Sequence, residues 1–88
     1  MIFITLAKFK KKPTKEFLDE SNRIVARGVE DGMKPLGMYW TLGRYDAVLV
    51  FEAPNEKIAE KILLRYGDWV STETLVAVPR EEAAKLVE

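Results

Sequence analysis

The side chains that could carry out chemistry in this 88-residue sequence are carboxylates, phenols and lysines, because the chain contains neither His nor Cys. The absence of His removes the most common general base and metal ligand. The absence of Cys removes thiol catalysis, disulfides and thiolate-bound metal. No phosphate-binding glycine loop is present either. We therefore expect no metal and no cofactor. An enzyme built on this chain would have to use Glu73, Asp46, Lys8, Tyr39 or Tyr45, or else a bound cofactor.

One group of polar residues stands out among the predicted strands. Glu73 is the charged residue in a set of odd-numbered strand positions that is otherwise apolar or hydroxyl-bearing, and Thr5, Tyr39 and Thr41 belong to the same set. Ligand sites combine apolar walls with a few converging polar groups, and Arg44 is the cation nearest to this set. These five residues are our candidates for a ligand site. The alternative is that Glu73 is a buried carboxylate held by Thr, Tyr or Arg for structural reasons.

A short turn carries the second group of candidates. Gly43 is expected to supply a backbone angle that larger residues resist. Asp46 would then open the next strand, where it either pairs with Lys8 or binds the backbone of residues 43–45. The functional alternative makes Asp46 and Lys8 polar anchors at the mouth of a pocket. Tyr45 extends from the same turn, where it could cap a neighbouring subunit.

The elements that must position these residues alternate between two hydrophobic periods. Strands are predicted over 2–9, 34–42, 46–52 and 69–78, and helices over about 14–31, 55–66 and 80–87. A right-handed crossover leaves room for the third strand beside the first. The order β-α-β-β-α-β predicts a ferredoxin-like α+β fold, a four-stranded antiparallel sheet with two helices on one face. A short C-terminal helix is appended, and residues 1–88 form a single domain.

The alternation within each strand predicts which side chains face the helices. We assign the even-numbered positions to the helix-covered core, which leaves an odd-numbered face that is too apolar for water. Such a face usually marks a self-complementary interface. We therefore expect a homo-oligomer assembled through the sheet, with five residues in the contact: Phe3, Ala47, Leu49, Phe51 and Leu75. The alternative is that the C-terminal helix folds over this face.

Composition and charge exclude several partners. The 14 Lys and Arg balance the 14 Asp and Glu, so no net charge favours nucleic acid or a membrane surface. The basic run over 8–15 contains no interleaved aromatic residue other than Phe9, which favours a solvated loop over a nucleic-acid site. The longest apolar run, 47–51, is far shorter than a membrane helix, and the order of charges at the N-terminus is the reverse of a signal peptide. We expect a cytoplasmic protein, and the absence of Gln favours a thermophilic source.

The run from Tyr39 to Val48, which contains Gly43, Tyr45 and Asp46, resembles the signature of the GYD-domain family. Further similar blocks lie at 4–8, 52–55 and 73–79, so the resemblance covers nearly the whole chain. It implies a ferredoxin-like fold that assembles through its sheets and has no established activity. Together with the residues, it predicts a homo-oligomer that binds a small molecule or a protein partner at the sheet face and is not an enzyme. The alternative is an enzyme of the dimeric α/β-barrel type.

Overall fold

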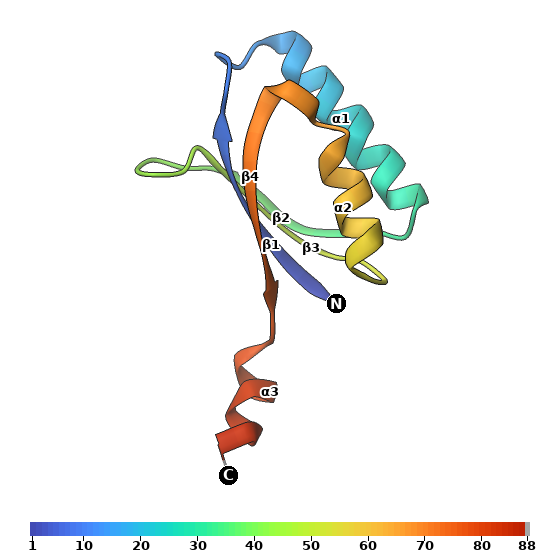
Figure 1. Ribbon diagram of the computed structural model, residues 1–88, viewed down its shortest axis with the longest axis vertical. Helices are drawn as coiled ribbons and strands as arrows, with labels where there is room; N and C mark the ends of the chain where they lie inside the picture. The colour runs from blue at the N-terminus through green and yellow to red at the C-terminus, as the bar shows by residue number, and fades with distance from the viewer. Residues whose placement is uncertain (88) are drawn as a thin grey trace.

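The computed structural model describes residues 1–87 and contains one antiparallel sheet with two helices on one of its faces (Figure 1). The sheet has four strands in the order β2-β3-β1-β4. Its elements are β1 (Ile2–Phe9), α1 (Lys15–Glu30), β2 (Lys34–Trp40), β3 (Ala47–Glu52), α2 (Glu56–Leu64) and β4 (Val70–Ala77). A short turn of 3₁₀ helix (Gly67–Trp69) precedes β4, and α3 (Arg80–Ala84) and a second 3₁₀ turn (Lys85–Val87) follow it. The predicted ferredoxin-like α+β fold and the position of the third strand beside the first are confirmed.

Side-chain caps begin both long helices. The Thr14 hydroxyl accepts a hydrogen bond from the backbone N–H of Phe17 at 3.2 Å, and the Asn55 side chain accepts one from Ile58 at 3.0 Å. Each satisfies a backbone donor that has no partner within the helix. Gly43, in the turn between β2 and β3, has a positive φ of 99°, a conformation that favours glycine. The predicted role of Gly43 in the turn is therefore confirmed.

The core lies between the sheet and the two helices. Phe3 and Phe51 stack with ring centroids 5.4 Å apart, and Ile24 of α1 and Ile62 of α2 close over them. A Cβ atom at Gly28 would lie 3.0 Å from the Met33 side chain and 3.3 Å from Ile62. The missing side chain at residue 28 therefore lets α1 approach α2 and the start of β2 closely.

The predicted assignment of sheet faces is wrong for β1 and β3. Phe3, Leu49 and Phe51 are 2%, 8% and 0% exposed and form the helix-covered core. Ala47 lies on the same side of β3 by alternation. Of the five predicted interface residues, only Leu75 lies on the face without helices.

The strand register explains this error. Partners in β1 and β3 have residue numbers of the same parity, such as Thr5 and Leu49. Partners in β1 and β4 have opposite parity, such as Thr5 and Thr74. The same holds for β2 and β3 from Gly37 to Trp40, after a register shift between Pro35 and Gly37. Odd-numbered residues therefore do not all lie on one face of the sheet. The sequence of a single strand does not show whether its odd-numbered residues share a face with the odd- or the even-numbered residues of the neighbouring strand.

The face of the sheet that carries no helix, here called the open face, is largely apolar. Its apolar members are Ile2, Ile4, Leu6, Tyr39, Val48, Val50, Leu75 and Ala77. The C-terminal segment does not fold over it. That segment projects away from the body beyond the end of β4 (Figure 1), and Leu86 and Val87 are 81% and 86% exposed.

No helix within residues 1–87 combines the length and the apolar character needed to cross a membrane.

Candidate ligand-binding cavity

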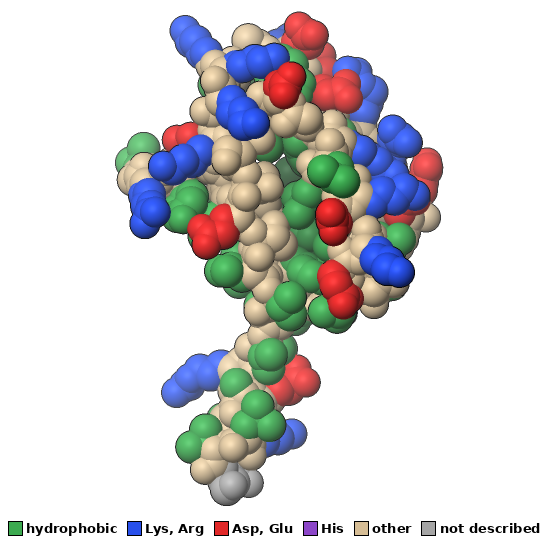
Figure 2. Space-filling view, in the orientation of Figure 1, with side chains coloured by type: hydrophobic (Ala, Val, Ile, Leu, Met, Phe, Trp, Pro, Cys, Tyr) green, Lys and Arg blue, Asp and Glu red, His purple; other side chains and the backbone are tan. Residues whose placement is uncertain are grey.

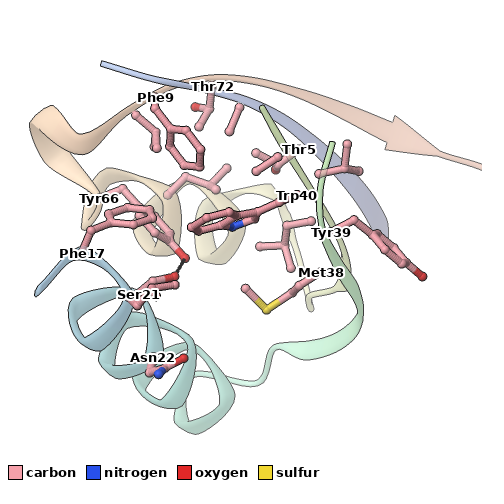
Figure 3. Close-up of a pocket in the computed structure, with 17 residues that line it drawn as sticks. Thr5, Phe9, Phe17, Ser21, Asn22, Met38, Tyr39, Trp40, Tyr66 and Thr72 are labelled. Carbon is pink, nitrogen blue, oxygen red and sulfur yellow. Dashed lines mark hydrogen bonds between the residues drawn. The ribbon is translucent and has the colours of Figure 1, made fainter. Parts of the chain in front are cut away.

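A cavity of about 180 Å³ lies between the sheet and the helices (Figure 3). We call it the helix-side cavity. Its lining comes from all four strands, from α1 and α2 and from the turn that follows α2: Thr5, Ala7, Phe9, Phe17, Leu18, Ser21, Asn22, Met38, Tyr39, Trp40, Ala47, Val48, Leu49, Leu63, Tyr66, Val70 and Thr72. The helix-facing side of β2 is partly uncovered, since Met38 and Trp40 on that side are 50% and 57% exposed.

Aromatic rings form the walls of the helix-side cavity. Phe9 meets Phe17 edge to face, with centroids 5.5 Å apart and an interplanar angle of 79°. Phe9 also meets Trp40 at 5.2 Å and 69°, and the Tyr66 ring is tilted against Phe17 with centroids 6.4 Å apart. Rings in edge-to-face contact hold one another in place through their quadrupoles. The walls are therefore made of rings set at steep angles to one another.

Two hydroxyl groups from different segments meet at the inner side of the cavity. Ser21 of α1 and Tyr66, just after α2, share a buried hydrogen bond of 2.9 Å between their oxygens (Figure 3). Burial raises the pKa of the Tyr66 phenol above its usual range, and the Ser21 hydrogen bond offsets part of that rise. Tyr66 therefore stays a neutral phenol at physiological pH.

The mouth of the cavity opens between α1 and β2. Leu18, Met38 and Trp40 stand around it and are 44%, 50% and 57% exposed. Met38 and Trp40 point from β2 toward the interior, whereas Tyr39 points away from it, and Asn22 lies on the facing side of α1 (Figure 3). A small molecule in bulk water can therefore reach the aromatic walls.

The lining residues of the helix-side cavity include no Asp, Glu, Lys or Arg. A second, wider groove between β4 and α2 is different, because Lys10, Glu56 and Glu60 contribute to it. Figure 2 shows hydrophobic side chains along this groove, with charged groups at its edge. Within residues 1–87, no group of three or more carboxylates is placed to hold a metal ion.

The five predicted ligand residues do not form one cluster. Thr5 lines the helix-side cavity and shares a hydrogen bond of 2.9 Å with Thr74. Glu73 pairs with Leu6 on the open face, whereas Thr5 points to the helix-covered face. The expected proximity of Glu73 to Thr5 is therefore wrong. The Tyr39 side chain also lies on the open face. Thr41 holds the turn, where its hydroxyl donates to the backbone carbonyl of Tyr45 at 2.7 Å.

A separate polar cluster lies at one end of the open face. The Tyr45 hydroxyl donates a 2.7 Å hydrogen bond to the Glu73 carboxylate. The Lys8 ammonium and the Arg44 guanidinium lie 5.9 and 5.5 Å from the centre of the Tyr45 ring. The hydrogen bond to Glu73 is the main cause that raises the pKa of Tyr45, while Arg44 acts in the opposite direction. The turn is thereby fastened to β4 across β1.

Asp46 has a hydrogen-bond partner that the sequence did not indicate. Its carboxylate accepts a hydrogen bond from the backbone N–H of Phe9 at 2.9 Å. Its own N–H donates to the carbonyl of Ala7, and its carbonyl accepts from Thr41. Within residues 1–87 it forms no ion pair with Lys8, and its carboxylate does not bind the backbone of residues 43–45, so both expected partners are wrong.

Sequence reasoning missed most of the cavity. Ser21 and Tyr66 fall on the apolar stripes of the two helical segments, where a hydroxyl is unusual, and this pattern is the signal that the sequence offers. Met38 and Trp40 were expected to pack in the core, yet each is at least half exposed. The reason is the edge position of β2, where the helices leave part of its helix-facing side uncovered.

Comparison with known proteins gives a family and a fold. The model of the family described as GYD domain matches residues 3–87. Among curated protein sequences, no significant match is found.

Three solved structures resemble the chain. Muconolactone isomerase has a TM-score of 0.60 at 16% identity and covers 90% of this chain and 92% of its own. The protein SCO4226 from Streptomyces coelicolor A3(2) has a TM-score of 0.58 at 13% identity and covers 88% of this chain and 95% of its own. FFRP-DM1 has a TM-score of 0.55 at 14% identity and covers 88% of this chain and 97% of its own. Likeness at such low identity concerns the fold alone.

Proposed function

This chain belongs to the GYD domain family, and from that premise we propose that it is a small-molecule-binding protein whose ligand occupies the helix-side cavity. The family and the shared fold carry no chemistry by themselves, because one fold hosts many functions. The function is therefore argued from the site.

The observation that carries the proposal is the helix-side cavity itself. Domains of this size normally fill their cores at the density of organic crystals. Here about 180 Å³ stays open beside Phe9, Phe17 and Trp40. Apolar walls with a few polar groups are the usual composition of a ligand site, and the Ser21 and Tyr66 hydroxyls supply polar groups at its inner side.

The chemistry of the lining supports binding rather than catalysis. General acid–base catalysis works best with a group whose pKa lies near the working pH. Tyr66 is the titratable side chain that reaches the cavity, since the Tyr39 side chain points away, and its pKa is raised. The carboxylates of Glu73 and Asp46 are engaged elsewhere, in hydrogen bonds to Tyr45 and to the Phe9 backbone.

The open face supports a second part of the proposal, a homo-oligomer assembled through the sheet. Ile4, Leu6, Val48 and Val50 lie next to one another across β1 and β3, and no helix covers them. Contiguous apolar surface of this kind is typical of an interface, and two-fold contacts between identical faces are the commonest arrangement. A cytoplasmic location and a thermophilic source remain predictions from composition.

A blocked-mouth variant tests ligand binding. Asn22 is exposed at the mouth, so Asn22→Trp should close the cavity without disturbing the core. The matched control is Arg23→Trp on the outer side of α1, where the side chain is 63% exposed. Fragments of up to roughly 12 non-hydrogen atoms, comprising alcohols, carboxylates and amines, would be screened by thermal shift and by tryptophan emission. At least one fragment should bind the original protein and Arg23→Trp but not Asn22→Trp. The proposal fails if no fragment binds, or if every binder is insensitive to Asn22→Trp.

A further inference from the structure

The geometry points to a defined class of ligand, which we infer to be an uncharged molecule with a single aromatic ring and one hydroxyl or carbonyl substituent. This inference rests on the proposed function and adds the chemistry of the occupant. Volume, charge, ring geometry and hydrogen bonding each limit the ligand independently.

The volume limits the size of the ligand. An apolar cavity of roughly 150 Å³ in another protein core is large enough to bind benzene. The helix-side cavity, at about 180 Å³, has space for one six-membered ring and a small substituent. A fused two-ring molecule would have to project through the mouth between Leu18 and Trp40.

The absence of charged lining residues limits the charge of the ligand. An ionised group that leaves water needs an opposite charge or several hydrogen bonds to replace its hydration. Neither a cation for a carboxylate nor an anion for an amine lines the cavity. Two charged residues of the polar cluster, Lys8 and Glu73, lie on the opposite face of the sheet. A neutral ligand is therefore strongly preferred over its charged analogues.

The ring geometry favours an aromatic ligand. Phe9 is nearly perpendicular to Phe17, at 79°, and is inclined at 69° to Trp40. A planar guest can therefore stack on one wall while its edge meets the face of another, which are the two arrangements that aromatic pairs prefer. A saturated guest of the same volume would gain only the apolar contact.

The hydroxyl pair supplies the hydrogen-bonding contact. Ser21 and Tyr66 together carry two O–H groups, and their mutual hydrogen bond uses one of them. The second O–H and the remaining lone pairs are free to bind a hydroxyl or a carbonyl group. Because Tyr66 stays protonated at neutral pH, the pair can both donate and accept.

Four probes of nearly equal size test the inference: benzyl alcohol, toluene, benzoate and benzylammonium. Binding would be followed at pH 7 by tryptophan emission and by amide chemical shifts of the intact chain. Benzyl alcohol should bind at least tenfold more tightly than either charged probe. The double variant Ser21→Ala/Tyr66→Phe removes both hydroxyls and leaves neither one unpaired. It should weaken the binding of benzyl alcohol at least threefold and leave the affinity for toluene within a factor of two. Asn22→Trp should abolish the binding of both probes.

The outcomes separate this inference from the proposed function. If benzoate or benzylammonium binds as tightly as benzyl alcohol and is displaced by Asn22→Trp, the ligand class is wrong although the cavity still binds ligands. If the double variant weakens the binding of toluene and of benzyl alcohol equally, the hydroxyl pair does not hydrogen-bond to the substituent and the inference is overturned. If no probe or fragment binds in a manner sensitive to Asn22→Trp, the proposed function fails as well.

Discussion

The carboxylate of Asp46 accepts a hydrogen bond from the backbone N–H of Phe9 at 2.9 Å, which fastens the turn before β3 to the last residue of β1. The backbone of Asp46 makes two further bonds in the same place, to Ala7 and Thr41. Three neighbouring segments are thereby joined through a single residue. Phe9 is in turn the ring against which Phe17 and Trp40 pack, so this contact also supports a wall of the helix-side cavity.

Replacement of Asp46 should therefore destabilise the fold. Asp46→Ala leaves the Phe9 N–H without its partner, and we expect a loss of about 1–3 kcal/mol in the free energy of unfolding. Asp46→Asn keeps an acceptor oxygen and should lose less. Urea denaturation followed by circular dichroism measures both variants. An unchanged midpoint for Asp46→Ala would contradict the structural role.

The hydrogen bond between Tyr45 and Glu73 should give the folded protein a distinct alkaline titration. The pKa of Tyr45 is raised above its unfolded value of about 10. The hydrogen bond therefore stabilises the fold below pH 10, and this contribution disappears as the pH rises through the folded pKa. Glu73→Gln should lower the pKa of Tyr45, measured as the difference in phenolate absorbance between each protein and its Tyr45→Phe counterpart. A pKa that is the same with Glu73 and with Gln at this position would exclude the contact.

The ion pair between the ends of the two helices should make the stability of the fold depend on pH in the acid range. Arg65, which ends α2, donates to Asp31, which ends α1, at 2.6 Å, and this hydrogen bond is the main cause that lowers the pKa of Asp31. The stabilisation is fully present above the unfolded pKa of about 3.9 and is lost as the pH falls through the lower folded value. Asp31→Asn should therefore reduce the thermal midpoint at pH 6 but lose that difference near pH 2. Equal effects at both pH values would show that charge plays no part.

Substitution of the open face should affect assembly and leave folding intact. Ile4→Lys places an ammonium at the centre of the proposed interface, and we expect a change from oligomer to monomer in sedimentation at micromolar concentration. The matched control is Leu64→Lys, on a side chain that is already 72% exposed on α2. An oligomer that persists in Ile4→Lys would exclude the open face as the interface.

Leu49→Lys should behave differently, because Leu49 is 8% exposed in the core. It combines the loss of a buried side chain with the burial of a charge, and we expect at least about 3 kcal/mol of destabilisation. Thermal unfolding of this variant compares directly with that of Ile4→Lys. A Leu49→Lys protein that is as stable as Ile4→Lys would contradict the observed assignment of faces.

The order and the approximate limits of the elements were determined by local features of the sequence. Thr14 and Asn55 cap their helices as their side-chain chemistry dictates, and Gly43 adopts the positive φ that few other residues tolerate. The strand order followed from short connections and from the handedness of the crossover. Such features act within a few residues, so one chain is sufficient to show them.

The faces of the sheet and the place of the proposed ligand site were decided by the tertiary structure alone. Both sides of β1 and β3 are apolar, so alternation could not show which side the helices would cover. The parity of the strand pairs decided it, and parity depends on how segments far apart in sequence come into register. The same long-range packing brought Ser21 to Tyr66 and left β2 partly uncovered, which created the cavity. No interaction within a single element specifies these relations, because each depends on where a second element lies.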